Sequence, residues 1–281
     1  MTTRRMMVAA AAVLALGLSA CASDDPDTGS GTATGDAGGG GLKVGIKYDQ
    51  PGLGLKQGSE FTGMDVDVAK YIAKELGVEA DAIEFIQAPS AQRETLIETG
   101  QVDMVVATYS ITDARKEKVS FAGPYFVAGQ DLLVRADDTS ITGPDTLEGK
   151  KLCSVTGSTS AQKVKEKVPG VNLQEFATYS ECVAALASGA IDALTTDDTI
   201  LAGYAAQDQY KGKLKVVGQP FSEERYGIGL KKGDTAQCQK ITDAINKMVT
   251  SGEWQKIVDA NLGPAGYKPG AGNPPTPDAC A

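Results

Sequence analysis

Histidine is absent from the 281 residues. This absence excludes Ser-His-Asp and Cys-His catalysis and the zinc sites that use histidine ligands, although carboxylate and lysine chemistry stay open. Long apolar runs are also scarce, because after the first 20 residues no stretch is long and apolar enough to cross a bilayer. Cysteine occurs five times, but never with the CxxC spacing of many metal sites. We therefore expect neither a metal nor a cofactor.

Basic residues are outnumbered by acidic ones. The chain has 27 Lys and Arg against 36 Asp and Glu, a net charge of -9. Its first 20 residues carry two Arg and no acid, so the rest of the chain has a charge of -11, which is -9 minus 2. Because a phosphate backbone requires a basic protein surface, we expect no nucleic-acid partner.

The N-terminus looks like a bacterial lipoprotein signal. Arg4 and Arg5 form a short positive region, residues 6–18 are apolar but too short for a comfortable membrane span, and Cys21 follows. We expect residues 1–20 to be removed, and lipid on Cys21 to hold the protein at the outer face of the cell membrane without spanning it. An ordinary secretory signal with a chance cysteine is the alternative.

Two segments with little to bury flank the rest of the chain. Residues 22–41 are mostly Gly, Ser, Thr, Asp and Pro, which predicts a disordered tether behind Cys21. Residues 267–281 are rich in Pro, Gly and Ala, which predicts a tail that runs along the surface. Between them lie roughly 225 residues, enough for one large domain or two small ones.

The four cysteines beyond Cys21 are an even number outside the cytosol, which indicates two disulfides. Three pairings are possible. We favour Cys153 with Cys182, within one half of the chain, and Cys238 with Cys280, which would tie the tail to a helix. Four free thiols are the alternative.

Strand-like and helix-like patterns alternate along the chain. Strands are predicted at 43–48, 83–86, 102–107, 131–135, 151–155, 191–194, 214–217 and 226–230, and helices at 64–76, 91–99, 159–167, 182–188, 199–206, 235–250 and 254–260. This alternation predicts an α/β architecture with mostly parallel sheets, in which ligands bind at the carboxyl ends of the strands.

Four motifs, in order along the chain, resemble the polar amino-acid-binding proteins of ABC importers. They are GMDVDV at 63–68, VDM to FAGPY at 102–125 with TDARKEKV at 112–119 inside it, GSTS at 157–160, and DDTILAG at 197–203. The resemblance covers residues 42–262. It implies an α/β fold of the two-lobed periplasmic-binding-protein-like type II, with a ligand cleft between the lobes and two hinge crossings. Lobe 1 would be residues 42–132 plus 222–266, and lobe 2 residues 133–221.

Three residues of the first lobe would hold the ligand's α-amino-acid group. Arg115 follows a predicted buried strand, and its planar guanidinium can bind an α-carboxylate through two hydrogen bonds. The resemblance gives the Ser110 hydroxyl and amide to the same carboxylate, and the Thr108 backbone carbonyl to the ammonium. The alternatives are a surface arginine and ordinary turn residues.

The second lobe would contribute a helix N-terminus and a carboxylate. Ser158, Thr159 and Ser160 precede or begin a predicted helix, where free amides and the helix dipole favour an anion, and Thr159 is the best candidate for this contact. Asp197 follows a buried strand and can bind the ammonium. The alternatives are helix caps, a role that Asp198 could take instead of Asp197.

Specificity would depend on Lys47, Ser90 and Arg93. In glutamate- and aspartate-binding members of the family, basic residues at the first and third of these positions and a hydroxyl at the second meet the side-chain carboxylate. Lys47 stands where better-known relatives have Arg and glutamine-binding relatives have Asp. Tyr179 stands where some relatives have His, and its hydroxyl can still donate a hydrogen bond.

The resemblance therefore implies a receptor rather than an enzyme, and because the sequence gives no sign of obligate oligomers we expect a monomer. It would capture free L-glutamate or L-aspartate by lobe closure and deliver it to the membrane permease of an ABC importer. Three alternatives stay open, namely a glutamine receptor, a sensory ligand-binding module and a dehydratase on the same fold. A dehydratase needs a general acid, and positions 47, 90 and 93 offer no dedicated extra carboxylate.

Overall fold

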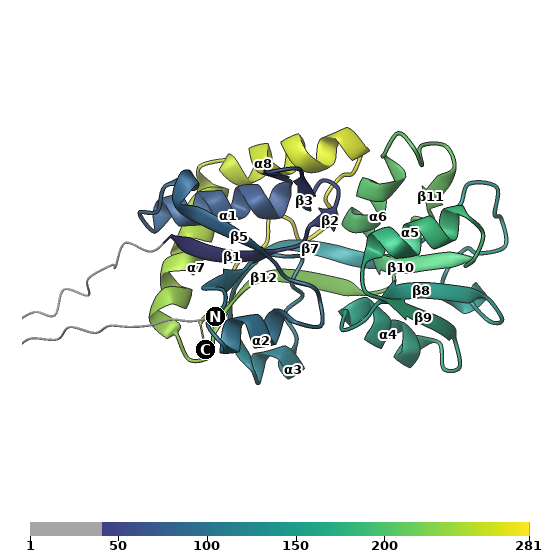
Figure 1. The fold of residues 1–281 in the computed structure, drawn as a ribbon, viewed down its shortest axis with the longest axis horizontal. Helices are drawn as coiled ribbons and strands as arrows, with labels where there is room; N and C mark the ends of the chain where they lie inside the picture. Colours follow the sequence, from purple (N-terminus) through teal and green to yellow (C-terminus); the bar gives the residue numbers. More distant parts are fainter. Residues whose placement is uncertain (1–40, 281) are drawn as a thin grey trace, which may run out of the picture. The chain divides into compact units, whose positions relative to one another are not determined.

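The computed structural model describes residues 41–280 (Figure 1). The predicted signal peptide, Cys21 and nearly all of the predicted tether lie outside the described residues. Within this part of the chain, no helix has the length and apolar character needed to cross a membrane.

Nine strands of residues 41–280 form one mixed sheet with the order β5-β1-β6-β12-β7-β10-β8-β9, to which β11 adds by pairing with β7. Their bounds are β1 Leu42–Ile46, β5 Ile83–Gln87, β6 Met104–Val105, β7 Val119–Arg135, β8 Lys151–Val155, β9 Asn172–Phe176, β10 Ala193–Asp197, β11 Leu214–Val216 and β12 Glu223–Lys231. A smaller antiparallel sheet contains β2 (Asp49–Gln50), β3 (Gly54–Gln57) and β4 (Glu60–Thr62).

The 17-residue strand β7 joins the two halves of the large sheet. It pairs with β12 from Val119 to Gly129, and with β10 and β11 from Gln130 to Arg135. We use "first lobe" for β1–β6 with the helices around them, and "second lobe" for β8–β11 with theirs; Figure 1 shows β7 and β12 running between them. The α/β fold with two lobes is confirmed, whereas the residue boundaries of the lobes stay predictions.

The predicted mostly parallel sheet is wrong in one respect. Pairs on either side, such as β1 with β5 and β8 with β9, are parallel, but β7 is antiparallel to β10, β11 and β12. The strand predicted at 131–135 is only the end of β7, because Gly123, Pro124 and Gly129 interrupt the apolar pattern without ending the strand. The strand predicted at 102–107 is reduced to β6.

Seven of the eight helices in residues 41–280 follow the sequence more closely, whereas α3 was not predicted. Their bounds are α1 Met64–Glu75, α2 Arg93–Glu98, α3 Asp113–Lys116, α4 Thr159–Lys167, α5 Tyr179–Ala187, α6 Asp198–Ala205, α7 Thr235–Thr250 and α8 Glu253–Leu262. Helix α5 begins three residues before the predicted start at 182. The reason is a capping box, in which the Thr178 hydroxyl accepts from the amide of Glu181 and the Glu181 carboxylate accepts from the amide of Thr178.

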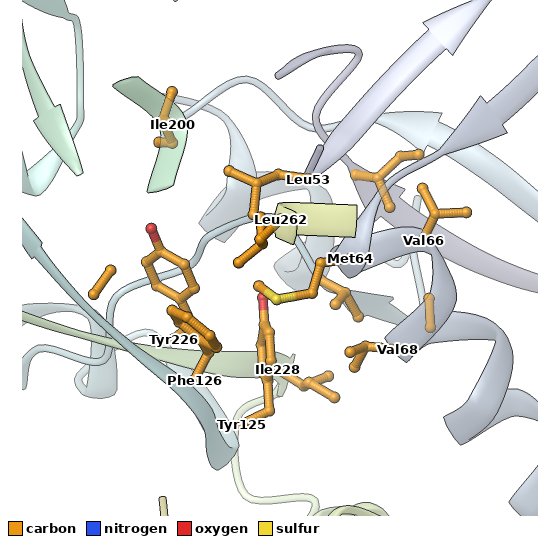
Figure 2. Close-up of a cluster of buried hydrophobic side chains, with 14 of the residues drawn as sticks. Leu53, Met64, Val66, Val68, Tyr125, Phe126, Ile200, Tyr226, Ile228 and Leu262 are labelled. Atoms are coloured by element: carbon orange, nitrogen blue, oxygen red, sulfur yellow. The ribbon is translucent and has the colours of Figure 1, made fainter. Parts of the chain in front are cut away.

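The core of the first lobe lies between α1, α8 and the strands β7 and β12. Figure 2 shows Met64 of α1 close to Tyr125 of β7 and to Leu262 of α8, all of them buried. Burying an apolar side chain of this size contributes roughly 1.5–3 kcal/mol. The Tyr125 hydroxyl satisfies its hydrogen bond inside the core by donating to Asp65 Oδ1 at 2.6 Å. This polar contact leads from the core to the cavity described below.

Both predicted disulfides are present. Cys153 with Cys182 joins β8 to α5, and Cys238 with Cys280 ties the C-terminal tail to α7. The tail, residues 267–280, has no helix or strand. Its Asn273 side chain accepts from the Val127 amide at 3.0 Å and donates to the Val127 carbonyl at 2.7 Å, so the tail lies against β7.

Candidate functional site

A small cavity lies between the two lobes. The side chains around it come from both lobes and are mostly polar. They are Ser90, Arg93, Thr108, Arg115, Ser158, Thr159, Ser160, Tyr179, Asp197 and Ile200. Eight of these ten are predicted binding residues; the other two predicted residues, Lys47 and Ser110, do not line the cavity.

Arg115 lies on α3 and is 8% exposed. Its Nη1 donates to the Ser110 carbonyl at 2.8 Å, its Nη2 to the Gly157 carbonyl of the second lobe at 3.1 Å, and its Nε lies 3.4 Å from Glu94 Oε1. A guanidinium has five N–H donors. Two donors remain, one on each terminal nitrogen, and can serve a carboxylate in the cavity.

Arg93 begins α2 and is 3% exposed. Its Nη2 donates to the Ser90 hydroxyl at 3.2 Å, and its guanidinium lies 5.1 Å from the centre of the Tyr109 ring. Among residues 41–280 its Nε has no hydrogen-bond partner, and no carboxylate lies within 4.0 Å of it. A cation this deeply buried requires a counter-charge, and an anionic ligand can supply it.

Lys47 adds a third cation beside the cavity. Its ammonium is 4.0 Å from Asp49 Oδ1 and lies 5.8 Å from the centre of the Tyr179 ring. Burial and, to a smaller extent, the nearby Arg93 lower the pKa of Lys47 to about 8, although Asp49 opposes both effects. Lys47 therefore lies within the electrostatic reach of Arg93, as expected if both face the same end of a ligand.

Asp197 is the acidic group of the cavity. It occupies the N-cap position of α6, but its side chain does not cap the helix. Instead its carboxylate accepts from the Tyr226 hydroxyl at 2.6 Å and from the Ser160 hydroxyl at 3.3 Å, while Asp198 accepts from the next amide of the helix. Burial, and next the Glu224 carboxylate, raise the pKa of Asp197 to about 8. A cation bound here would stabilise the ionised form.

The N-terminus of α4 completes the wall of the second lobe. Ser158 caps this helix by accepting from the Ala161 amide at 3.0 Å, so the capping interpretation is correct for Ser158. The Thr159 hydroxyl lies 3.3 Å from the Ser110 hydroxyl of the first lobe. This bond places Ser110 next to the cavity although it does not line it. The amide contact expected from Thr159 stays a prediction.

Thr108 has an unusual backbone conformation. Its φ of 46° lies in the left-handed region, which a β-branched residue rarely adopts and which costs roughly 1–3 kcal/mol. The strained turn is held by Asp65, whose Oδ2 accepts from the Thr108 amide at 2.9 Å. The other oxygen of Asp65 accepts from Tyr125. An α1 carboxylate therefore supports the turn that presents Thr108 to the cavity.

The fully buried Asp65 should make the stability of the protein depend on pH. Burial raises the pKa of Asp65 from 3.8 to about 6, so the folded state holds a proton that the unfolded state has lost. This contribution to stability is present below pH 4 and disappears as the pH rises through 6. The free energy of unfolding of the wild type should therefore fall by about 3 kcal/mol between pH 4 and pH 7, and Asp65→Asn should abolish this fall. Urea unfolding at both pH values measures it. The same dependence of the free energy of unfolding on pH in both proteins would contradict this prediction.

Comparison with known proteins places the chain in a family. Residues 42–264 match the family described as bacterial extracellular solute-binding proteins, family 3. The chain belongs to this family. This solute-binding protein is 52% identical to the glutamate-binding protein GluB of Corynebacterium glutamicum. The alignment covers 80% of this chain and 79% of the relative. It is 47% identical to GluB of Corynebacterium efficiens, in an alignment that covers 94% of this chain and 92% of the relative.

A solved structure supports the same assignment. An ancestral arginine-binding protein bound to glutamine superposes on this solute-binding protein with a TM-score of 0.74 and 37% identity, over 80% of this chain and 98% of the other. The predicted family and the extracytoplasmic class of protein are therefore confirmed. The lipid on Cys21 stays a prediction, because Cys21 lies outside the described residues.

Several residues that shape the site were missed by the sequence analysis. Tyr226 reaches Asp197 from β12, Glu94 pairs with Arg115, and the Tyr109 ring lies under both Arg93 and Arg115, at 5.1 and 4.9 Å. Tyr109 offered a local signal, because it stands between two predicted binding residues. Tyr226 offered none, since it lies 29 residues beyond its partner in the sequence.

Proposed function

We propose that this solute-binding protein captures an acidic amino acid, glutamate with aspartate as the second candidate, and delivers it to the permease of an ABC importer. The observation that carries the proposal is the buried Arg93, a cation beside the cavity with no carboxylate within 4.0 Å among residues 41–280 and with an Nε that lacks a hydrogen-bond partner there. The side-chain carboxylate of the ligand would be that partner. The relatives named glutamate-binding proteins support the same choice.

The ligand would be held at three points. The two free donors of Arg115 would bind the α-carboxylate, aided by the hydroxyl and amide of Ser110 and by the N-terminus of α4. Asp197 would bind the ammonium together with the carbonyl of Thr108. At the far end, Arg93, Lys47 and Ser90 would bind the second carboxylate, with Tyr179 beside them. Arg93 and Lys47 are each less than 4% exposed, so solvent screens these charges little.

Closure of the lobes would complete the site. Arg115 of the first lobe bonds to Gly157 of the second at 3.1 Å, and the hydroxyls of Ser110 and Thr159 lie 3.3 Å apart. Contacts of this kind favour a closed arrangement around a ligand. Binding would then shift the population from open to closed lobes without any chemistry.

The competing functions fit the site less well. A glutamine amide would leave Arg93 uncompensated in a buried place, and a lysine or arginine side chain would be repelled there. A dehydratase needs a free general acid at the same end, but Asp49 lies beside Lys47 and Glu94 pairs with Arg115. A sensory role would use the same pocket and would differ only in the partner that reads the closed form.

The proposal includes the location of the protein. A lipid on Cys21 would anchor the monomer at the outer face of the cell membrane, with residues 22–41 as the tether to the permease. Metabolic labelling with a fatty acid would test the anchor, and Cys21→Ala should abolish the label.

Thermal unfolding with a panel of amino acids tests the ligand. A ligand at about 100 times its dissociation constant adds roughly 2.7 kcal/mol of stability, which corresponds to about 5–10 °C for a protein of this size. We expect glutamate to give the largest shift, aspartate a smaller one and glutamine little. 2-Oxoglutarate, which has both carboxylates but no ammonium, is the control and should give no shift. A response to glutamine alone would refute the proposed specificity.

A further inference from the structure

Asp49 connects the two lobes at the edge of the cavity. It begins β2 in the first lobe, two residues after Lys47. Its Oδ2 accepts from the backbone amides of Tyr179 and Ser180, at 3.0 and 3.3 Å, at the start of α5 in the second lobe. The Tyr204 hydroxyl of α6 donates to the backbone carbonyl of Asp49 and lies 3.3 Å from Oδ2. One short segment thus contacts two helices of the opposite lobe.

Helix α5 leaves these two amides for Asp49 to satisfy. A helix begins with amides that have no partner inside the helix, and their dipoles favour a negative charge. The capping box of Thr178 and Glu181 satisfies the amides of those two residues only. The amides of Tyr179 and Ser180 are paired by the Asp49 carboxylate, which the first lobe brings to them. The N-terminus of α5 is therefore complete when the lobes are together.

The same carboxylate acts on the end of the cavity that would bind the ligand's side chain. Its Oδ1 lies 4.0 Å from the Lys47 ammonium and favours the charged form of that lysine. Tyr179, whose amide it binds, lines the cavity, and the Tyr179 ring lies 5.8 Å from the Lys47 ammonium. Asp49 thus contacts Lys47 of the first lobe and Tyr179 of the second at the end of the cavity that would bind the ligand's side chain.

The backbone next to Asp49 also packs closely against the second lobe. A Cβ added to Gly203 of α6 would lie 2.1 Å from the carbonyl oxygen of Pro51. Glycine at this position therefore lets the segment that follows Asp49 lie directly against α6.

We propose that Asp49 is a positioning residue, an interlobe latch that completes the N-terminus of α5 and holds Lys47 and Tyr179 in place once a ligand is enclosed. The inference rests on the proposed function for its ligand, but not for its geometry. A contact that forms only on closure should slow the release of the ligand and leave its capture by the open form nearly unchanged.

Stopped-flow binding of L-glutamate tests the latch. Asp49→Ala should raise the dissociation rate constant about 10- to 100-fold, the range for hydrogen bonds to a charged group, and change the association rate constant less than about threefold. Asp49→Asn, which keeps an acceptor but not the charge, should recover part of the loss. A dissociation rate constant for Asp49→Ala equal to that of the wild type would overturn the proposal.

The control variant is Glu181→Ala. It breaks the capping box at the same end of α5, but its bonds do not cross between the lobes. It should change the dissociation rate constant less than about threefold. An increase as large as that of Asp49→Ala would also overturn the latch, because loosening of α5 alone would then explain both variants.

Amide hydrogen exchange separates this proposal from the identity of the ligand. In the complex with whichever amino acid gives the largest thermal shift, the amides of Tyr179 and Ser180 should be protected in the wild type and exchange faster in Asp49→Ala. If wild-type protein binds no glutamate, the proposed function fails, while this measurement still decides the latch. Equal exchange in the two proteins would refute it.

Discussion

Replacing Arg115 with alanine is expected to weaken glutamate binding at least a hundredfold, or about 2.8 kcal/mol. The reason is that the fork of Arg115 would meet the α-carboxylate in a place that is nearly closed to water. Charge-assisted, bidentate hydrogen bonds are among the strongest in proteins. Isothermal titration calorimetry with L-glutamate measures the loss directly.

Two further variants keep this result interpretable. Arg115→Lys retains the positive charge but loses the fork, and we expect it to weaken binding as well, though less than alanine. Arg135→Ala is the matched control, because Arg135 also pairs with a carboxylate, Asp192 at 3.6 Å, and does not line the cavity. Its affinity should equal that of the wild type. Near-normal affinity in a folded Arg115→Ala protein would remove Arg115 from the site.

The sequence predicted those parts of the site that follow from local rules. Thr159 and Asp197 each stand where a strand or turn passes into a predicted helix, and such junctions are readable from composition and spacing. Arg115 was assigned from the motif that the chain shares with the family, because its helix α3 was not predicted. Helix α7 was predicted with its observed bounds, because Asp234 caps one end and Gly252 follows the other. The disulfide pairs were also within reach, since the alternatives were few.

The parts that were missed depend on contacts between distant residues. The left-handed turn at Thr108 is held by Asp65, which lies 43 residues earlier. Asp49 meets α5 about 130 residues later in the chain. Strand β7 contains residues that usually interrupt a strand, and it is continuous because β12 and β10 pair with its successive parts. The periodicity of a sequence depends on residues that are close together in the chain, so it does not predict these contacts between distant residues.

Neutralising Arg93 should change the order of preferred ligands. Arg93→Met keeps most of the buried volume but removes the one charge beside the cavity that has no carboxylate partner among residues 41–280. We expect glutamate affinity to fall about a hundredfold, because a carboxylate would lose its main partner in a buried place. Glutamine affinity should stay within about threefold of the wild type or rise, since an amide does not require that charge. Calorimetry with both ligands measures the ratio.

Lys47 and Arg93 can be separated by the same measurement. Lys47→Met should reduce glutamate preference less than Arg93→Met does, because Lys47 already has Asp49 at 4.0 Å and its pKa is lowered to about 8 by burial. Lys47→Asp should reduce it more than Lys47→Met, since a carboxylate there would repel that of the ligand. Arg93→Lys, which keeps the charge, should retain the preference for glutamate. An unchanged ratio of glutamate to glutamine affinity in Arg93→Met would show that the buried guanidinium does not select the ligand, and the assignment of an acidic amino acid would lose its structural basis.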